Sequence, residues 1–470
     1  MINKLIDQKK NFSNNFGTIY RSSAIFYIPK NIKTTISISN YWEFKNNVIV
    51  GIVVSIRKLN GKLYSRYEKN FKNSNIINLS DFGLKEGSIE IEAYSNTNLR
   101  IPYAAIMCIY EGKNSINMVH TYARNHSITE LEENKAIINA KESCWTIKSN
   151  LENKAVFHNG HLETNKQKAK IILTNQDGSE IKKYFNIPTM KPFATYIFEL
   201  KKIFPEYKKF FKNEDGFATL HFNNNSSFTR LLLIWSTKNN REFQTTHSNF
   251  DYSKYITNKI KTKVGGEMTI PEMPKLINDL KLIVYPKFEK SNYLFKLNDY
   301  KAEKFNHGFT KKIDLDTHKV TFSTDKDFIP SRIVTGITAK YKKKKIPFEC
   351  SMGINHINAR KKRFGWALVS GKHISYVHIN KISIINNPIS KTFIFKLYNS
   401  LNKEVATKKK LISLDQTNRT IINLKNILKN YKKFLGNKYG YITIFNEDSS
   451  IRFYTSLYDT KKGMTIEHAF

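Results

Sequence analysis

One stretch of this sequence occurs twice. Residues 200–220 (LKKIFPEYKKFFKNEDGFATL) align without a gap with residues 424–444 (LKNILKNYKKFLGNKYGYITI), and ten of the 21 positions are identical, whereas unrelated segments of ordinary composition would share about two. In both copies apolar residues recur at i, i+3, i+4 and i+7, which is the spacing of a helix face. The repeat therefore predicts that the chain builds one structural unit at least twice, with a short helix in each copy.

The similarity extends beyond this segment. Trp145 and Trp366 are separated by 221 positions, the same offset that separates His247 from His468, and the motif His-x-x-Ala-Arg occurs at 120–124 and at 356–360. Weaker similarities relate the first part of the chain to the rest. We therefore predict four related modules: 1–125, 126–252, 267–358 and 359–470, with a linker at 253–266 and with the fourth module repeating the second.

Short strands separated by turns dominate the pattern within each module. Apolar and polar residues alternate in 87–95 (GSIEIEAYS) and 440–448 (GYITIFNED), and Asp177-Gly178 is a strong hairpin signal. A parallel α/β sheet would need long amphipathic crossover helices, and only 195–212 and 420–436 come close to that pattern. The predicted fold class is all-β: tandem β-sandwich modules, each with at most one short helix in a crossover.

The charge of the chain is strongly positive. Lys and Arg total 77 against 39 Asp and Glu, a formal net charge of +38, but only 12 of the basic residues are arginine. Because arginine is the residue that pairs in bidentate fashion with phosphate and guanine, dispersed lysine favours a solvated surface over sequence-specific nucleic-acid binding. An anionic partner, such as an acidic glycan, a nucleic acid bound without sequence preference or a membrane surface, remains an open alternative.

The cysteines and the lengths of the apolar runs indicate in which cellular compartment the protein resides. The three cysteines, Cys108, Cys144 and Cys350, are far apart and odd in number, so no disulfide framework is predicted. We find no signal peptide, and no apolar run is long enough to span a bilayer. These features predict a cytoplasmic protein, with export by a leaderless route as the open alternative.

Histidines gather near the predicted module junctions, where loops at strand ends often carry functional sites. Histidine is the commonest metal ligand, so they could form a divalent-metal site, and we predict no other cofactor. The alternative is that the histidines recur through shared ancestry and bond neighbouring backbone. The candidate ligands are His120, His126, His158, His161, His247, His356, His378 and His468.

Two further pairs are candidate ligand-binding residues. Arg124 and Arg360 occupy the same place in the repeated His-x-x-Ala-Arg motif, and they could clamp a carboxylate or a phosphate or pair with an acid at a module interface. Tyr41 and Trp42 form an aromatic patch flanked by Asn and Lys, which suggests contact with a glycan.

The sequence contains no GxSxG, P-loop, GxGxxG or CxxC motif. Our leading hypothesis is a non-catalytic, multi-module protein that binds or scaffolds, with an anionic glycan or a protein as partner. The alternatives are a metal-dependent enzyme with a histidine site at the module junctions, and non-specific binding of nucleic acid through a lysine-rich surface.

Overall fold

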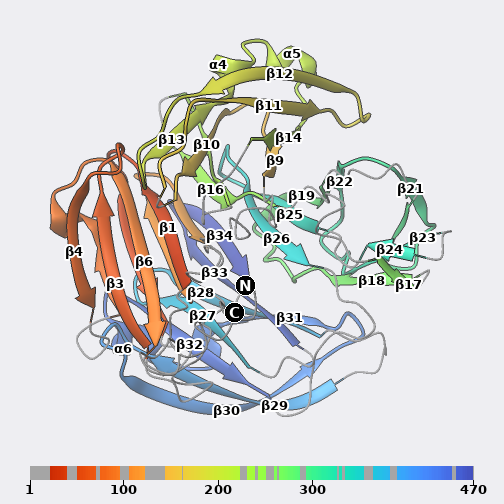
Figure 1. Ribbon diagram of the computed structural model, residues 1–470. Helices are drawn as coiled ribbons and strands as arrows, with labels where there is room; N and C mark the ends of the chain where they lie inside the picture. Colours follow the sequence, from red (N-terminus) through yellow and green to blue (C-terminus); the bar gives the residue numbers. More distant parts are fainter. Residues whose placement is uncertain are drawn as a thin grey trace, which may run out of the picture.

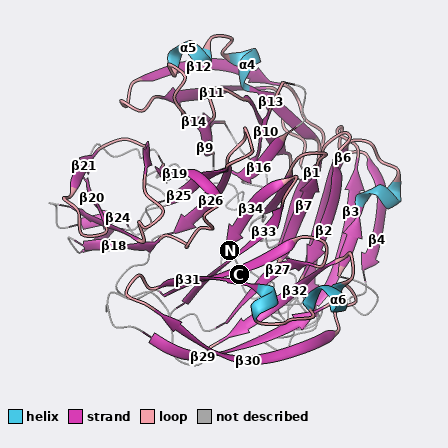
Figure 2. Cartoon of the chain, turned by 180° about the vertical axis from the view of Figure 1, so that it is seen from behind, coloured by secondary structure: helices cyan, strands magenta, loops and turns pink. Residues whose placement is uncertain are grey.

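The computed structural model of the chain describes residues 22–39, 50–69, 75–95, 105–121, 143–160, 162–222, 230–238, 242–249, 259–261, 264–285, 293–324, 328–330, 334–353, 364–381, 389–446 and 451–468. These residues form eight four-stranded antiparallel sheets and one two-stranded sheet, which confirms the predicted all-β class. The sheets form four groups that surround a common centre (Figures 1 and 2). No helix in these ranges is long and apolar enough to cross a membrane.

The strands fall into four modules in chain order. The first module contains β1 (Ser22–Ile28), β2 (Lys33–Ile38), β3 (Val50–Arg57), β4 (Leu63–Lys69), β5 (Ile76–Asn78), β6 (Gly87–Ser95), β7 (Ile106–Glu111) and β8 (Ile116–His120). The second contains β9 (Cys144–Ile147), β10 (Glu152–His158), β11 (Gln167–Thr174), β12 (Glu180–Ile187), β13 (Thr195–Glu199), β14 (Gly216–His221), β15 (Leu232–Ser236) and β16 (Phe243–His247). The third contains β18 (Val264–Thr269), β19 (Ile277–Val284), β20 (Tyr293–Leu297), β21 (Glu303–Phe305), β22 (Phe309–Lys312), β23 (Lys319–Thr324), β25 (Val334–Tyr341) and β26 (Phe348–Gly353). The fourth contains β27 (Phe364–Ser370), β28 (Ile374–Lys381), β29 (Ile389–Tyr398), β30 (Glu404–Leu414), β31 (Arg419–Asn423), β32 (Tyr439–Phe445), β33 (Ile451–Asp459) and β34 (Gly463–His468).

All four modules have the same topology. If the eight strands of a module are numbered in chain order, one sheet has the order first, sixth, third, fourth, and the other has the order fifth, second, seventh, eighth. The third module has an additional pair, β17 (Lys259–Lys261) with β24 (Phe328–Pro330). Three predicted module boundaries, at 125, 252 and 358, lie outside the described residues, and β18 begins at Val264, within the predicted linker.

The two copies of the repeated segment occupy the same topological place. Each connects the fifth strand of its module to the sixth, through α4 (Leu200–Ile203) and α5 (Tyr207–Phe210) in the second module, and through η3 (Leu424–Asn426) and α6 (Tyr431–Leu435) in the fourth. The first module has η1 (Leu79–Phe82) at this place. Pro205, between α4 and α5, has no N–H to donate, so it divides the helical segment of the second module.

Residues shared by the two copies perform matching tasks. Tyr207 and Tyr431 are both buried, and each hydroxyl donates a hydrogen bond to the turn between the first two strands of its module, to Leu151 O at 2.7 Å and to His373 O at 3.4 Å. Gly216 lies against the ring of Phe211, and Gly440 lies against Leu435 and Tyr398 O. A Cβ at either glycine would overlap these atoms, so close packing explains why both copies carry glycine there.

The four modules form a closed ring. The eighth strands β8, β16, β26 and β34 contact one another in the order β8, β16, β26, β34 and back to β8. Each of these strands is the edge strand of its sheet. Because the four edges face one another at the centre of the ring, none of them is left exposed to solvent. Side chains complete the unpaired backbone: Asn117 Nδ2 donates to Phe243 O at 3.1 Å, Thr245 N donates to Asn117 Oδ1 at 3.0 Å, and Met118 N donates to Thr465 Oγ1 at 3.1 Å.

The hydrophobic cores continue across the module interfaces. The core of the first module includes Val156 from the second module and Trp366 from the fourth. The core of the third includes Phe217 from the second module and Tyr458 from the fourth. The ring therefore buries apolar area at its junctions as well as within each sandwich. Cys108, Cys144 and Cys350 are all buried.

Candidate functional site

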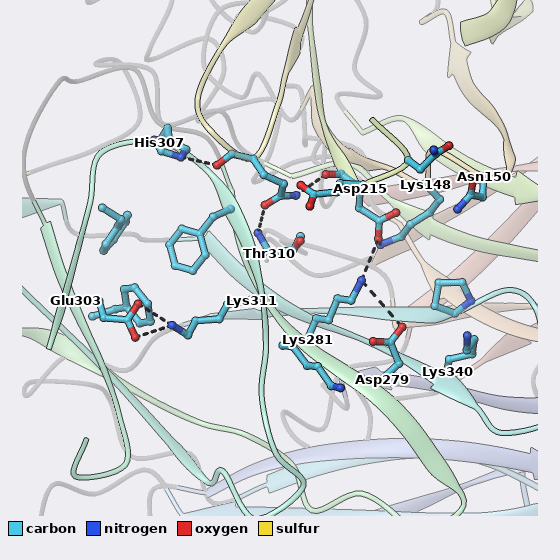
Figure 3. Close-up of a pocket in the computed structure, with 18 of the residues that line it drawn as sticks. Lys148, Asn150, Asp215, Asp279, Lys281, Glu303, His307, Thr310, Lys311 and Lys340 are labelled. Atoms are coloured by element: carbon cyan, nitrogen blue, oxygen red, sulfur yellow. Dashed lines mark hydrogen bonds and ion pairs between the residues drawn. The ribbon is translucent and has the colours of Figure 1, made fainter. Parts of the chain in front are cut away.

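A cleft of about 680 Å³ lies between the second and third modules (Figure 3). The second module supplies the turn before β10, the tip of the β11–β12 hairpin and the loop that precedes β14. The third module supplies part of β19 and β20, the edge strands β21 and β22, and the β25–β26 hairpin. The cleft is therefore built mainly from turns and short edge strands, which tolerate polar side chains because they need not pack in a core.

Lysine dominates the lining of the cleft. Seven lysines and four carboxylates line it, an excess of three positive charges. The lysines are Lys148, Lys281, Lys304, Lys311, Lys312, Lys340 and Lys345. Phe295, Phe305 and Phe309 add an aromatic component to the same wall. Such a cavity combines cations with an apolar surface, a combination that suits a ligand with anionic groups on a carbon framework.

Only some of the cleft lysines form ion pairs with carboxylates. Lys281 Nζ lies 4.0 Å from both Asp215 Oδ2 and Asp279 Oδ2, and Lys311 pairs with Glu303 (Figure 3). Among the described residues, the other four lysines of the third module's wall form no ion pair. These are Lys304, Lys312, Lys340 and Lys345, of which Lys340 is half-buried and the others are exposed.

The tip of the β11–β12 hairpin fixes the two walls relative to each other. Gln176 O accepts a hydrogen bond from His307 Nε2 at 2.8 Å, and Gln176 Oε1 accepts one from Thr310 N at 2.8 Å (Figure 3). Gln176 Nε2 also donates to Asp215 O within its own module. The predicted Asp177-Gly178 turn thus forms as expected and also makes a contact between modules, so the cleft has a defined shape.

A buried charge network lies behind the cleft. Lys148 Nζ is 3.4 Å from Asp215 Oδ2 and 3.4 Å from Glu349 Oε2. Thr146 Oγ1 and Tyr285 OH donate to the Glu349 carboxylate at 2.6 and 2.7 Å. Burial alone would lower the pKa of Lys148, but Asp215 and Glu349 outweigh it and raise the pKa. The ammonium group is thus held charged by its partners and joins the second module to the third.

A second cluster lies where the eighth strands of three modules meet. His120 ends β8, His247 ends β16 and His468 ends β34. The ring centroids of His120 and His247 are 4.5 Å apart, and those of His120 and His468 are 4.2 Å apart. Together with Glu467, these residues offer four ligand atoms that all lie within 4.8 Å of one another. The matching strand of the third module, β26, carries no histidine.

Hydrogen bonds define the protonation state of this cluster. Arg230 Nη1 lies 2.8 Å from His120 Nε2. Because a guanidinium can only donate, Nε2 accepts and the ring proton is on Nδ1, which lies 3.2 Å from Glu467 Oε1. His247 Nδ1 donates to Ser248 O at 2.9 Å, which places its lone pair on Nε2. Burial, reinforced by Arg230, holds the pKa of both His120 and His247 well below the usual range, so both rings are neutral.

Two other predicted histidines lie apart from this cluster. His158 Nδ1 lies 3.0 Å from Thr195 Oγ1, and burial together with Arg57 lowers the pKa of His158 to about 3. His378 Nδ1 donates to Glu272 O at 3.0 Å, while Nε2 accepts from Ser456 Oγ at 2.8 Å, and burial lowers its pKa to about 4. His378 therefore joins the third module to the fourth through its hydrogen bonds.

The remaining predicted site residues lie outside the described residues. They are Tyr41, Trp42, Arg124, Arg360, His126, His161 and His356. Sequence reasoning missed Glu467, Arg230 and the lysines of the cleft. Glu467 directly precedes a predicted ligand, which is a usable signal, whereas lysines drawn from five separate segments of a lysine-rich chain leave no local pattern.

Comparison with known proteins adds no identification. No protein-family model matches this chain, and no curated protein matches it. A solved structure of a glycosyl hydrolase family 2 member from Bacteroides cellulosilyticus DSM 14838 aligns over 95% of this chain and 92% of its own, with 6% identity and a TM-score of 0.13. A TM-score of 0.13 carries no inference about fold or activity.

Proposed function

We propose that this protein is a non-catalytic binding protein, and that the cleft between its second and third modules holds an acidic glycan. The observation that carries the proposal is the set of four lysines, Lys304, Lys312, Lys340 and Lys345, that form no ion pair among the described residues and line one concave wall. Basic residues outnumber acidic ones two to one in the whole chain. The proposal is therefore supported by the position of these four lysines in one cleft. The excess of basic residues over the whole chain does not by itself support it.

The chemistry of the cleft favours sulfate or carboxylate groups on a sugar framework. A lysine ammonium acts as a point charge with three donors, so it suits anionic groups whose spacing varies along a polymer. Phe309 is half-buried and lies beside Lys311 and Thr310, which gives the carbon-bound face of a sugar an apolar surface. The cleft is open to solvent at the exposed lysines, as a polymeric ligand requires.

Binding of a sulfated oligosaccharide and of a neutral oligosaccharide of equal length tests the proposal. We expect the double variant Lys340→Gln/Lys345→Gln to weaken binding of the sulfated ligand by about 30–150-fold, since each of the two lost charged contacts contributes roughly 1–1.5 kcal/mol. The matched control is Lys408→Gln/Lys409→Gln, which removes two exposed lysines from β30 in the fourth module. We expect the control to retain binding within about twofold.

Two results would contradict the proposal. Equal losses in the cleft variant and the β30 control would show that net charge alone attracts the ligand. Duplex DNA that binds as tightly as the sulfated ligand, with the same response to both variants, would favour the nucleic-acid alternative.

A further inference from the structure

We infer that the histidine cluster at the centre of the ring is a binding site for a divalent transition metal, held by His247, His468 and Glu467 and positioned by His120. This inference is independent of the proposed glycan cleft. Two imidazoles and one carboxylate are ligands that bind Zn²⁺ or another late first-row transition-metal ion. Ca²⁺ and Mg²⁺ instead prefer sites built from oxygen ligands.

His247 supplies the strongest single observation. Its side chain is buried, its Nδ1 donates to Ser248 O, and no hydrogen bond among the described residues reaches its Nε2. A buried lone pair without a donor is unfavourable. A metal-bound histidine has this same arrangement, in which the non-ligating N–H donates to a carbonyl and orients the ring.

Glu467 is held in place for a similar role. Its Oε1 accepts from His468 N at 2.9 Å and lies 3.2 Å from His120 Nδ1, and its side chain is only 4% exposed. One oxygen of this carboxylate lies within 4.8 Å of a ligand atom of each of His120, His247 and His468. Glu467 can therefore supply the oxygen ligand of the site.

His120 acts as a positioning residue. Arg230 Nη1 occupies its Nε2 at 2.8 Å, and its Nδ1 lies 3.2 Å from Glu467 Oε1. The chain Arg230, His120, Glu467 therefore resembles the outer shell of a metal site, in which hydrogen-bonded partners fix the ligating carboxylate.

The geometry accommodates an ion after a small movement. In a tetrahedral site with bonds of about 2.1 Å, two ligand atoms lie about 3.4 Å apart, and the ligand atoms here lie within 4.8 Å of one another. The widest pair must close by at most about 1.4 Å. His468 allows this closure and an approach for the ion, because 31% of its side chain is exposed.

Titration of the full chain with Zn²⁺ after chelator treatment, with Co²⁺ absorption as a second probe, tests this inference. We expect one ion per chain, a melting temperature that rises with Zn²⁺, and binding at least 100-fold weaker in Glu467→Gln and His468→Ala. Glu467→Gln keeps the side-chain shape, and His468 is partly exposed, so both variants should fold, as circular dichroism will verify. The positioning variant His120→Gln should weaken binding about 10–100-fold.

The matched control is His318→Ala, which removes a half-buried histidine outside the cluster and should leave binding unchanged. Absence of saturable binding at one ion per chain would overturn the inference. So would folded Glu467→Gln and His468→Ala variants that bind Zn²⁺ as tightly as the natural protein.

Discussion

Glu111 offers the sharpest test of the closed ring, because it joins the first module to the last. Its carboxylate accepts from Tyr439 OH, Lys372 Nζ and Lys462 Nζ, each at 2.7 Å, and its side chain is only 4% exposed. The substitution Glu111→Gln keeps the shape and removes the charge. Hydrogen bonds to charged groups contribute about 1.5–3 kcal/mol each, but Lys372 is 44% exposed and water screens its share. We therefore expect a loss of about 2–4 kcal/mol.

The pH dependence of this loss follows from the pKa of Glu111. Burial raises that pKa, but hydrogen bonds from His373, Lys372, Lys462 and Tyr439 outweigh burial and hold it well below the usual range. A carboxylate with a depressed pKa stabilises the fold fully above its unfolded pKa, near 4.3, and progressively less as the pH falls below that value. The difference between the natural protein and Glu111→Gln should be constant at neutral pH and shrink below about pH 4.3.

Urea unfolding followed by tryptophan fluorescence at several pH values measures this difference. The control is Glu404→Gln, which removes a carboxylate that pairs with Lys396 and is 40% exposed, and which should cost less than about 1 kcal/mol. The reasoning is refuted if Glu111→Gln is no less stable than the control, or if its deficit grows as the solution is acidified.

Two further predictions concern the ring and the repeat. Asn117→Ala removes both hydrogen bonds between this buried amide and β16, leaving Phe243 O and Thr245 N without that partner, and should cost about 2–4 kcal/mol in urea unfolding. Asn60→Ala, in an exposed turn, should cost under about 1 kcal/mol, and equal losses would contradict the role of Asn117. Gly216→Ala and Gly440→Ala should each lower stability by about 1–3 kcal/mol, because the new Cβ overlaps packed atoms. A melting temperature unchanged in both variants would refute the shared packing.

Local patterns in the sequence predicted the fold class and the equivalence of the two repeated segments. Alternation, the Asp177-Gly178 turn and the helical spacing around Tyr207 and Tyr431 act over a few residues, so they can be read from a single chain. The ring is different. Glu111 meets Lys462 across 351 positions, and such contacts follow from the complementary shapes of folded modules.

The candidate sites divide in the same way. The sequence left two interpretations of the recurring histidines open, a gathered site or structural residues of shared ancestry. In the structure His120, His247 and His468 lie together, whereas His158 and His378 make separate hydrogen bonds. Position in a repeat predicts which strand end a residue occupies, but it does not predict which strand ends face the centre. The lysines of the cleft had no local signal, because both walls must fold before the lysines become neighbours.

Circular closure changes how this protein should lose its structure. In an open row of repeats the two terminal units have one neighbour each, and they fray first. Here every module has two neighbours, so no unit is terminal in space. Deleting any one module would expose two apolar junction surfaces at once, and the remaining three should behave as a frayed chain and not as a smaller stable ring.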